Sequence, residues 1–279
     1  MEALLPPFCQ FSAECMARVF VYQMIMNTVR YYPIAALVFF VLWVWKKTFF
    51  SPYRIQERAV EPKRIWYEIR YSFYTLVIFV VQATLVTALA KMGYSRAYLE
   101  FGKYGPGYEL FAFVLLIVWH ETFFYWMHRL IHHPRLFKWI HLVHHRSTSP
   151  SPFAAYSFHP IEGFLEALYV SVFIFVVPVH PVVVVSQAFY AMIMNIAWHS
   201  GYEFFPSGWT RGRFTRWINT STHHNMHHSH VNCNYSLYLN FWDRICGTNH
   251  PRYDEYFEAV RARARRPATG APGAELPAA

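Results

Sequence analysis

The chain has 279 residues, of which 55% are hydrophobic and only 15% are charged, and its formal net charge is +9. A soluble domain has about 25% charged residues, and the hydrophobic residues here come in long runs, so the composition indicates a membrane protein. The basic residues gather at the ends of those runs, which argues against a nucleic-acid partner.

Apolar runs predict an all-α integral membrane bundle of about four spans, with a re-entrant hairpin as an alternative for the last two runs. A span takes about 20 apolar residues, and the last two runs are short and joined by a turn at 178–181. The runs are 34–45, extended upstream by 19–29 across Arg30 and Pro33, then 73–90, 110–127, 164–177 and 182–198. We divide the chain into an N-terminal transmembrane anchor (1–107), a catalytic region (108–258) and a disordered tail (259–279).

The basic residues predict the orientation. The segment 46–70 carries seven Lys and Arg residues, whereas 91–107 carries three. By the positive-inside rule the first segment is cytoplasmic, so the third span returns to the cytoplasm near His128. The two runs between 146 and 223 then bring the chain back to the same face, which predicts a histidine-rich helical cap on the cytoplasmic side.

All sixteen histidines lie between His120 and His250, and most fall into three spaced sets. On a helix, residues i, i+3 and i+4 share one face, so each set is expected to aim its imidazoles at a common point. Interfacial snorkelling explains lone histidines such as His120, His180 and His250 but not these repeated patterns. The sets, with His199 at the end of the last run as a ninth candidate metal ligand, are His128 and His132; His141, His144 and His145; and His224, His227 and His228. His223 could replace His224, although the spacing favours His224.

Imidazole suits iron, copper, zinc and nickel alike, so the ligands alone do not choose the metal. Neutral ligands leave the metal charge uncompensated, which predicts nearby carboxylates. Candidates are Glu121, Glu162 and Asp243, although Asp243 could instead pair with a neighbouring arginine. Asn195, four residues before His199, is a weaker candidate that could act through water. None of the four cysteines forms a CxxC pair, so neither a disulfide framework nor a thiolate cluster is expected.

The boxes resemble those of the fatty acid hydroxylase/sterol desaturase superfamily of membrane di-iron oxygenases. The resemblance covers about residues 108–250. The first box is Tyr125-Trp-Met-His128-Arg129 with His132, and His141-Leu-Val-His144-His145 follows closely. The third, His224-Asn-Met-His227-His228, precedes Asn234-Tyr235 and Trp242-Asp243-Arg244-Ile-Cys-Gly247-Thr248. The stretch from Phe158-His159-Pro160 to Leu165 looks most like C-5 sterol desaturases, and His199-Ser-Gly201-Tyr202 also resembles cholesterol 25-hydroxylases.

The resemblance implies an oxidoreductase with two iron ions, for which zinc is a possible substitute, that uses O2 to desaturate or hydroxylate a sterol-like lipid from the bilayer. Electrons would come from a separate donor, cytochrome b5-like or ferredoxin-like, because the chain shows no haem, flavin or iron–sulfur motif. The alternatives are a hydroxylase of fatty acyl or sphingoid chains and a zinc-binding or zinc-transporting membrane protein. A transporter would place its ligands near the bilayer midplane, whereas these sets lie at the ends of the apolar runs.

Overall fold

The computed structural model describes residues 9–56 and 60–265, and this part of the chain is helical, with isolated bridges in place of β-strands. Short 3₁₀ turns at Ser51–Tyr53, Pro152–Tyr156, Trp209–Arg211 and Thr215–Trp217 connect the helices. The helices are α1 (Ala13–Phe39, continued by a π-helical segment Phe40–Trp45), α2 (Lys47–Phe50), α3 (Pro62–Lys91), α4 (Tyr108–Ile131), α5 (Pro134–Ile140), α6 (Leu142–His145), α7 (Pro160–Val176), α8 (Pro181–Trp198), α9 (Ser221–His230), α10 (Phe241–Ile245) and α11 (Tyr253–Arg265).

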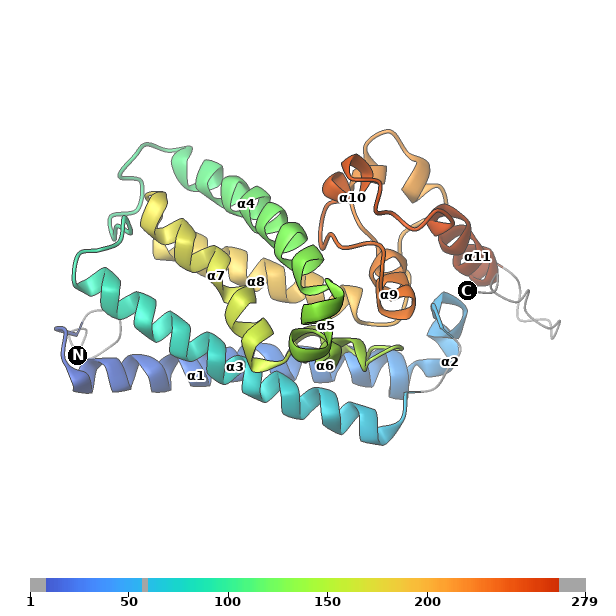
Figure 1. Ribbon diagram of the computed structural model, residues 1–279, viewed down its shortest axis with the longest axis horizontal. Coiled ribbons are helices and arrows are strands. Elements are labelled where there is room, and N and C mark those ends of the chain that lie inside the picture. The colour runs from blue at the N-terminus through green and yellow to red at the C-terminus, as the bar shows by residue number, and fades with distance from the viewer. Residues whose placement is uncertain (1–8, 57–59, 266–279) are drawn as a thin grey trace.

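Four helices of the described chain are long and apolar enough to cross a membrane, which confirms the predicted all-α membrane bundle. They are Ala13–Trp45, Pro62–Lys91, Tyr108–Ile131 and Pro181–Trp198. Helix α7, at 17 residues, is connected to α8 by a short turn and packs against α3 and α4. In Figure 1, α1 and α3 lie along one side of the bundle, and α4, α7 and α8 lie above them.

Helix α1 runs without a break through Arg30 and Pro33, which interrupt the apolar run in the sequence. A proline removes one backbone hydrogen bond, but packing against a neighbouring helix lets a membrane helix tolerate it. On either side of Pro33, Tyr31 and Ala35 are fully buried in a core with Leu76 of α3. The Tyr31 hydroxyl also donates to the Phe153 carbonyl at 2.9 Å, so tertiary contacts fix the helix at its weakest point.

The π-helical end of α1 connects the anchor to the histidine-rich end of the molecule. The Trp43 indole donates to the Ser200 carbonyl at 3.0 Å, directly after His199. Gly201 follows with φ of 79°, and a Cβ built on it would lie 2.8 Å from the Trp43 ring. Glycine is therefore required here both for its backbone conformation and for the close approach of the indole.

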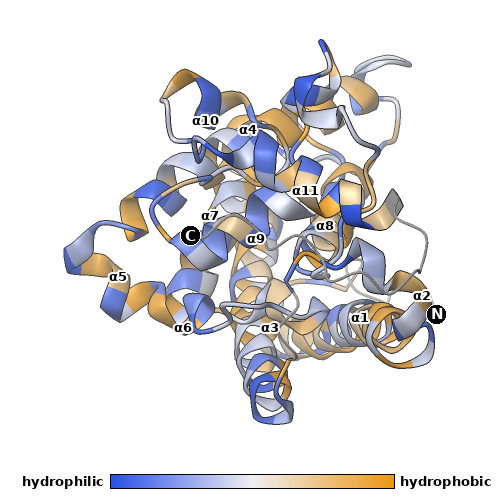
Figure 2. Cartoon of the chain, turned by 90° about the vertical axis from the view of Figure 1, so that its right-hand side faces the viewer, coloured by the Kyte–Doolittle hydropathy of each residue, from blue (hydrophilic) through white to orange (hydrophobic). Residues whose placement is uncertain are grey.

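All the predicted ligand sets lie at one end of the bundle. Helix α4 ends there, α5 and α6 follow, and α8 returns to the same end before α9 (Figure 1). Seen onto this end, hydrophilic stretches of α9, α10 and α11 lie among hydrophobic ones (Figure 2). The predicted return of the chain to one face between 146 and 223 is thus what the α7–α8 hairpin provides.

The two ends of the chain differ from the sequence-based expectation. Cys9 forms a disulfide with Cys15 in the first turn of α1, although no bridge was expected because the pair lacks a recognised spacing. The two residues lie at the bundle end opposite the histidines, where Lys91 donates to the Cys9 carbonyl. Helix α11 continues to Arg265, so the predicted tail begins as helix, and its remainder, 266–279, lies outside the described residues.

Candidate metal centre

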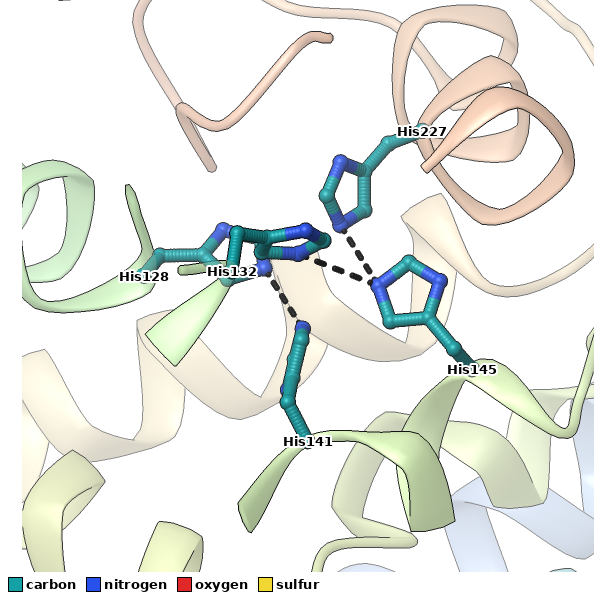
Figure 3. A group of neighbouring side chains, drawn as sticks. All are labelled: His128, His132, His141, His145 and His227. Carbon is teal, nitrogen blue, oxygen red and sulfur yellow. Dashed lines mark hydrogen bonds between the residues drawn. The ribbon is translucent and has the colours of Figure 1, made fainter. Parts of the chain in front are cut away.

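Nine buried histidines meet in two groups, and they are the nine that the sequence predicts as ligands. Within each group, one nitrogen from every ring lies within 4.8 Å of the others. The first group, shown in Figure 3, comprises His128, His132, His141, His145 and His227, and the second comprises His144, His199, His224 and His228. The groups are adjacent, since the rings of His145 and His228 have centroids 5.1 Å apart.

The predicted sets do not each converge on a single point. Pairs spaced i, i+4 stay together: His141 with His145 in the first group, and His224 with His228 in the second. The remaining histidine of the second set, His144, belongs to the second group, and the remaining histidine of the third set, His227, belongs to the first group. Adjacent helical residues point about 100° apart, so His144 and His227 diverge from the histidines that follow them. Two of the three sets therefore contribute to both groups and tie them together.

The histidines of the second set do not lie on a single helix. His141 lies between α5 and α6 rather than within one helix, so this set comes from two short helices.

The nitrogen spacing in the first group fits a metal ion. The Nε2 atoms of His128 and His141 are 3.0 Å apart, and His145 Nε2 lies 3.2 Å from His132 Nε2 and 3.0 Å from His227 Nε2 (Figure 3). Ligand nitrogens that each lie about 2.1 Å from one ion are separated by roughly 3 Å. The packing of the rings alone thus produces the separation that a shared ion requires.

The second group has the same spacing. His199 Nε2 lies 2.9 Å from His224 Nε2, 3.2 Å from His228 Nε2 and 3.4 Å from His144 Nε2. His224 and His228 are themselves 3.2 Å apart at Nε2. Four imidazoles are enough for one ion with a position left for another ligand.

Hydrogen bonds at Nδ1 orient several of these rings. The Nδ1–H groups of His128, His227 and His199 donate to the carbonyls of Tyr235, Cys233 and Asn195 at 2.7, 2.7 and 2.8 Å. A carbonyl can only accept, so each neutral ring presents an Nε2 lone pair to its group. An unprotonated Nε2 directed into a group of imidazoles is the ligand atom that a metal ion binds, so these three rings are oriented as metal binding requires.

Glu162 is the predicted carboxylate that contacts a histidine of the groups. Its Oε1 lies 2.6 Å from His141 Nδ1, and both side chains are almost fully buried. A carboxylate behind an imidazole fixes the ring and raises its basicity, as in many carboxylate–histidine–metal arrangements.

Glu121 and Asp243 act on the backbone instead. The Glu121 carboxylate accepts from the amides of Leu237 and Tyr238 at 3.0 and 2.7 Å. Asp243 accepts from the amides of Tyr235 and Ser236 at 2.9 and 2.7 Å. Together they hold the segment 235–238, whose first carbonyl orients His128. This segment is a functional element that sequence reasoning missed.

Histidines outside the two groups have structural contacts. His120 is buried with its ring 4.0 Å from that of Tyr169, and His180 caps α8 through the amide of Val182. His223 Nε2 is 3.1 Å from Asn249 Oδ1 and 3.5 Å from Asp243 Oδ2, so His224, not His223, joins the second group. His250 accepts from the Arg252 amide.

Burial favours the neutral form of the group histidines that lie outside the spans. Burial, and then the neighbouring His199 imidazole, lowers the pKa of His224 well below its ordinary value. Burial likewise lowers the pKa of His199 to about 4. A neutral imidazole is the form that binds a metal ion, so the groups are prepared for binding at neutral pH.

A small cavity opens between the two groups. His141 of the first group and His199 of the second line it, and the rings of Phe124 and Phe158 form apolar walls. Glu162, Glu166 and Asn195 add polar side chains. Asn195 therefore serves twice, because its carbonyl orients His199 and its side chain faces the cavity.

The comparison with known proteins agrees with this geometry. The family model described as fatty acid hydroxylase matches residues 113–248, which hold all nine histidines of the groups. Residues 113–248 are thus similar to the fatty acid hydroxylase family. With its four apolar helices, the chain is an integral membrane protein.

Curated relatives carry sterol names. The chain is 34% identical over 185 residues to a lathosterol oxidase of Homo sapiens, covering 65% of this chain and 60% of that protein. It is 31% identical over 198 residues to a Delta(7)-sterol 5(6)-desaturase of Gibberella zeae, covering 70% and 59%. The chain spans about 60% of the length of the curated relatives it matches. No solved structure matches the chain.

Proposed function

We propose that this protein is a membrane di-iron oxidoreductase that uses O2 to desaturate or hydroxylate a sterol-like lipid, in the manner of a C-5 sterol desaturase. The observation that carries the proposal is the pair of buried histidine groups, whose Nε2 atoms face one another at 2.9–3.4 Å. The names of the relatives supply the sterol substrate class. Irons bound there would supply the oxidising power that removes hydrogen from an unactivated C–H bond.

The nine histidines of the groups are the proposed iron ligands. Glu162 holds the proton on His141 Nδ1 and so keeps His141 Nε2 free for the metal. The Tyr235 and Cys233 carbonyls do the same for His128 and His227. Phe124 and Phe158 form the apolar part of the cavity wall, which would help to exclude bulk water from the reacting lipid.

The electron donor is proposed to be a separate cytochrome b5-like or ferredoxin-like protein. Two electrons are required for each turnover, and the sequence shows no haem, flavin or iron–sulfur motif that would supply them. Purified chain should therefore bind iron but oxidise lipid only when a reducing partner is added.

We place the histidine end on the cytoplasmic face. Lys46, Lys47 and Arg54 lie at that end, in or next to α2, and the Cys9–Cys15 disulfide lies at the opposite one. Disulfides persist in oxidising compartments and are rare in the cytosol, so both features support the same orientation. A membrane-impermeant maleimide should label the free thiol of Cys246 only after cells are permeabilised, and labelling in intact cells would reverse the orientation.

The direct test is lipid profiling of cells with and without the chain, combined with iron analysis. We expect a sterol that gains a double bond or a hydroxyl group, about two irons per chain, and no haem absorbance. A fatty acyl or sphingoid hydroxylase is the second candidate, favoured by the fatty acid hydroxylase match, and would instead yield a hydroxylated chain. A protein that binds zinc and changes no lipid would refute both.

A further inference from the structure

The cavity between the histidine groups is very small. About 10 Å³ of it admits the centre of a water-sized sphere, which is room for one water molecule or one hydroxyl group. Its lining combines metal-facing imidazoles with the side chains of Glu162 and Glu166 on α7 and Asn195 on α8. A group that enters it must be small and must satisfy these polar atoms.

Three polar groups at the cavity lack partners among the described residues. Asn195 Oδ1 and Glu162 Oε2 are buried without a hydrogen bond. The Glu166 side chain is 9% exposed, and no hydrogen bond to it occurs in the described part of the chain. Asn195 Nδ2 donates to the Ala155 carbonyl at 2.7 Å, which fixes the amide and leaves Oδ1 for the cavity.

These atoms form a site for a hydrogen-bond donor. Leaving a buried acceptor unsatisfied costs about 1–3 kcal/mol, so the two buried acceptors Asn195 Oδ1 and Glu162 Oε2, with Glu166 beside them, indicate that a ligand supplies the missing partner. Glu162 and Glu166 are four residues apart on α7 and face the same way, while Asn195 faces them from α8. A hydroxyl group fits between them in both size and chemistry.

We propose that Glu166 and Asn195 bind the hydroxyl group of the lipid substrate and thereby position it head-first beside the two histidine groups. The proposal rests on the function proposed above and specifies how the substrate is oriented. A sterol carries its hydroxyl on carbon 3, only two bonds from carbon 5, so a hydroxyl held here brings that carbon close to the metals. A hydroxyl site beside the metals would not position an acyl chain that is oxidised far from its polar head.

The test measures binding separately from turnover. Tritiated lathosterol is bound to the full-length, chelator-treated protein in nanodiscs and competed with unlabelled lathosterol or its 3-methyl ether. The ether lacks the donor hydrogen and is larger than the cavity, so we expect it to compete at least about tenfold more weakly. Lathosterol oxidation is measured in parallel on the iron-loaded protein with a reducing partner.

Variants of Glu166 identify the site. Glu166→Leu breaks no hydrogen bond of the described chain, so we expect it to fold and to lose the preference for the alcohol. Glu166→Gln keeps an accepting oxygen and should retain most of that preference. Val185→Ala, on the exposed side of α8, is the matched control and should bind both sterols as the wild type does.

The outcomes are separable. Equal binding of alcohol and ether by a protein that oxidises lathosterol would overturn the hydroxyl site and leave the proposed function intact; the cavity would then hold only water. Full discrimination by Glu166→Leu would overturn the assignment to Glu166. Hydroxyl-dependent binding without oxidation of any lipid would support the site and refute the proposed function.

Discussion

Replacing Glu162 with Gln should weaken metal binding at the first histidine group. In the native protein, Glu162 Oε1 lies 2.6 Å from His141 Nδ1, and the side chains are 0% and 1% exposed. The carboxylate accepts the Nδ1 proton and leaves Nε2 as the ligand atom. A glutamine has nearly the same shape, but it exchanges a charge-assisted hydrogen bond for a neutral one and can reverse the imidazole tautomer.

The expected loss is 10–100-fold in affinity, the range typical of a changed partner behind a metal-bound histidine. This corresponds to about 1.4–2.7 kcal/mol. The assay is an anaerobic titration of chelator-treated protein with Fe(II) against a competing chromophoric chelator. We expect one of two sites to weaken and the other, held by His144 and its partners, to remain.

Glu166→Gln is the matched control for this experiment, since Glu166 lies one turn further along the same helix and bonds no histidine. It should leave both iron affinities within about twofold of the wild type. If Glu162→Gln also binds two irons within twofold of the wild type, the carboxylate does not support the first site and the assignment is wrong.

Three further predictions use matched changes. His227→Ala should lose iron from the first group and abolish turnover, whereas His230→Ala, on the same helix but outside both groups, should retain both; iron analysis and lipid oxidation decide. Gly201→Ala should destabilise the protein by at least about 2 kcal/mol more than Gly208→Ala. Both glycines have positive φ, but only at Gly201 would the new methyl group meet a side chain, the Trp43 indole at 2.8 Å. Equal melting temperatures of the two variants would contradict this. Burial lowers the pKa of His199 to about 4, below its unfolded value of about 6.5, so the unfolded chain binds the proton first. His199 alone should therefore lower the free energy of unfolding of the metal-free protein by about 3 kcal/mol as the pH falls from 6.5 to 4. A melting temperature that stays constant over that range would refute the buried, neutral state.

The sequence was sufficient to predict the membrane helices and the histidines that gather in the two groups, because both depend on local spacing. A run of apolar residues has to be helical to satisfy its backbone in a bilayer, and i, i+4 spacing keeps His141 with His145 and His224 with His228. The division of the second and third sets between the two groups was not predictable in the same way. It depends on the approach of α6 to α9 and α8, which places His144 beside His199 rather than beside His145.

The disulfide shows a different limit. Cys9 and Cys15 are six residues apart, a spacing with no recognised meaning, and their pairing depends on how the chain turns into α1. The continuity of α1 through Pro33 is also a tertiary effect, because the buried contacts of Tyr31 offset the missing backbone hydrogen bond.

The roles of Glu121 and Asp243 follow from contacts that join distant parts of the chain. Both were singled out because a metal site needs negative charge nearby, yet neither contacts a histidine of the two groups. They bind instead the amides of the segment 235–238, which lies more than 100 residues after Glu121. That segment supplies the carbonyl for His128, so the carboxylates determine where a ligand points without approaching the metal. Spacing in a sequence can indicate which residues bind a metal, but the groups that aim those residues depend on the closed fold.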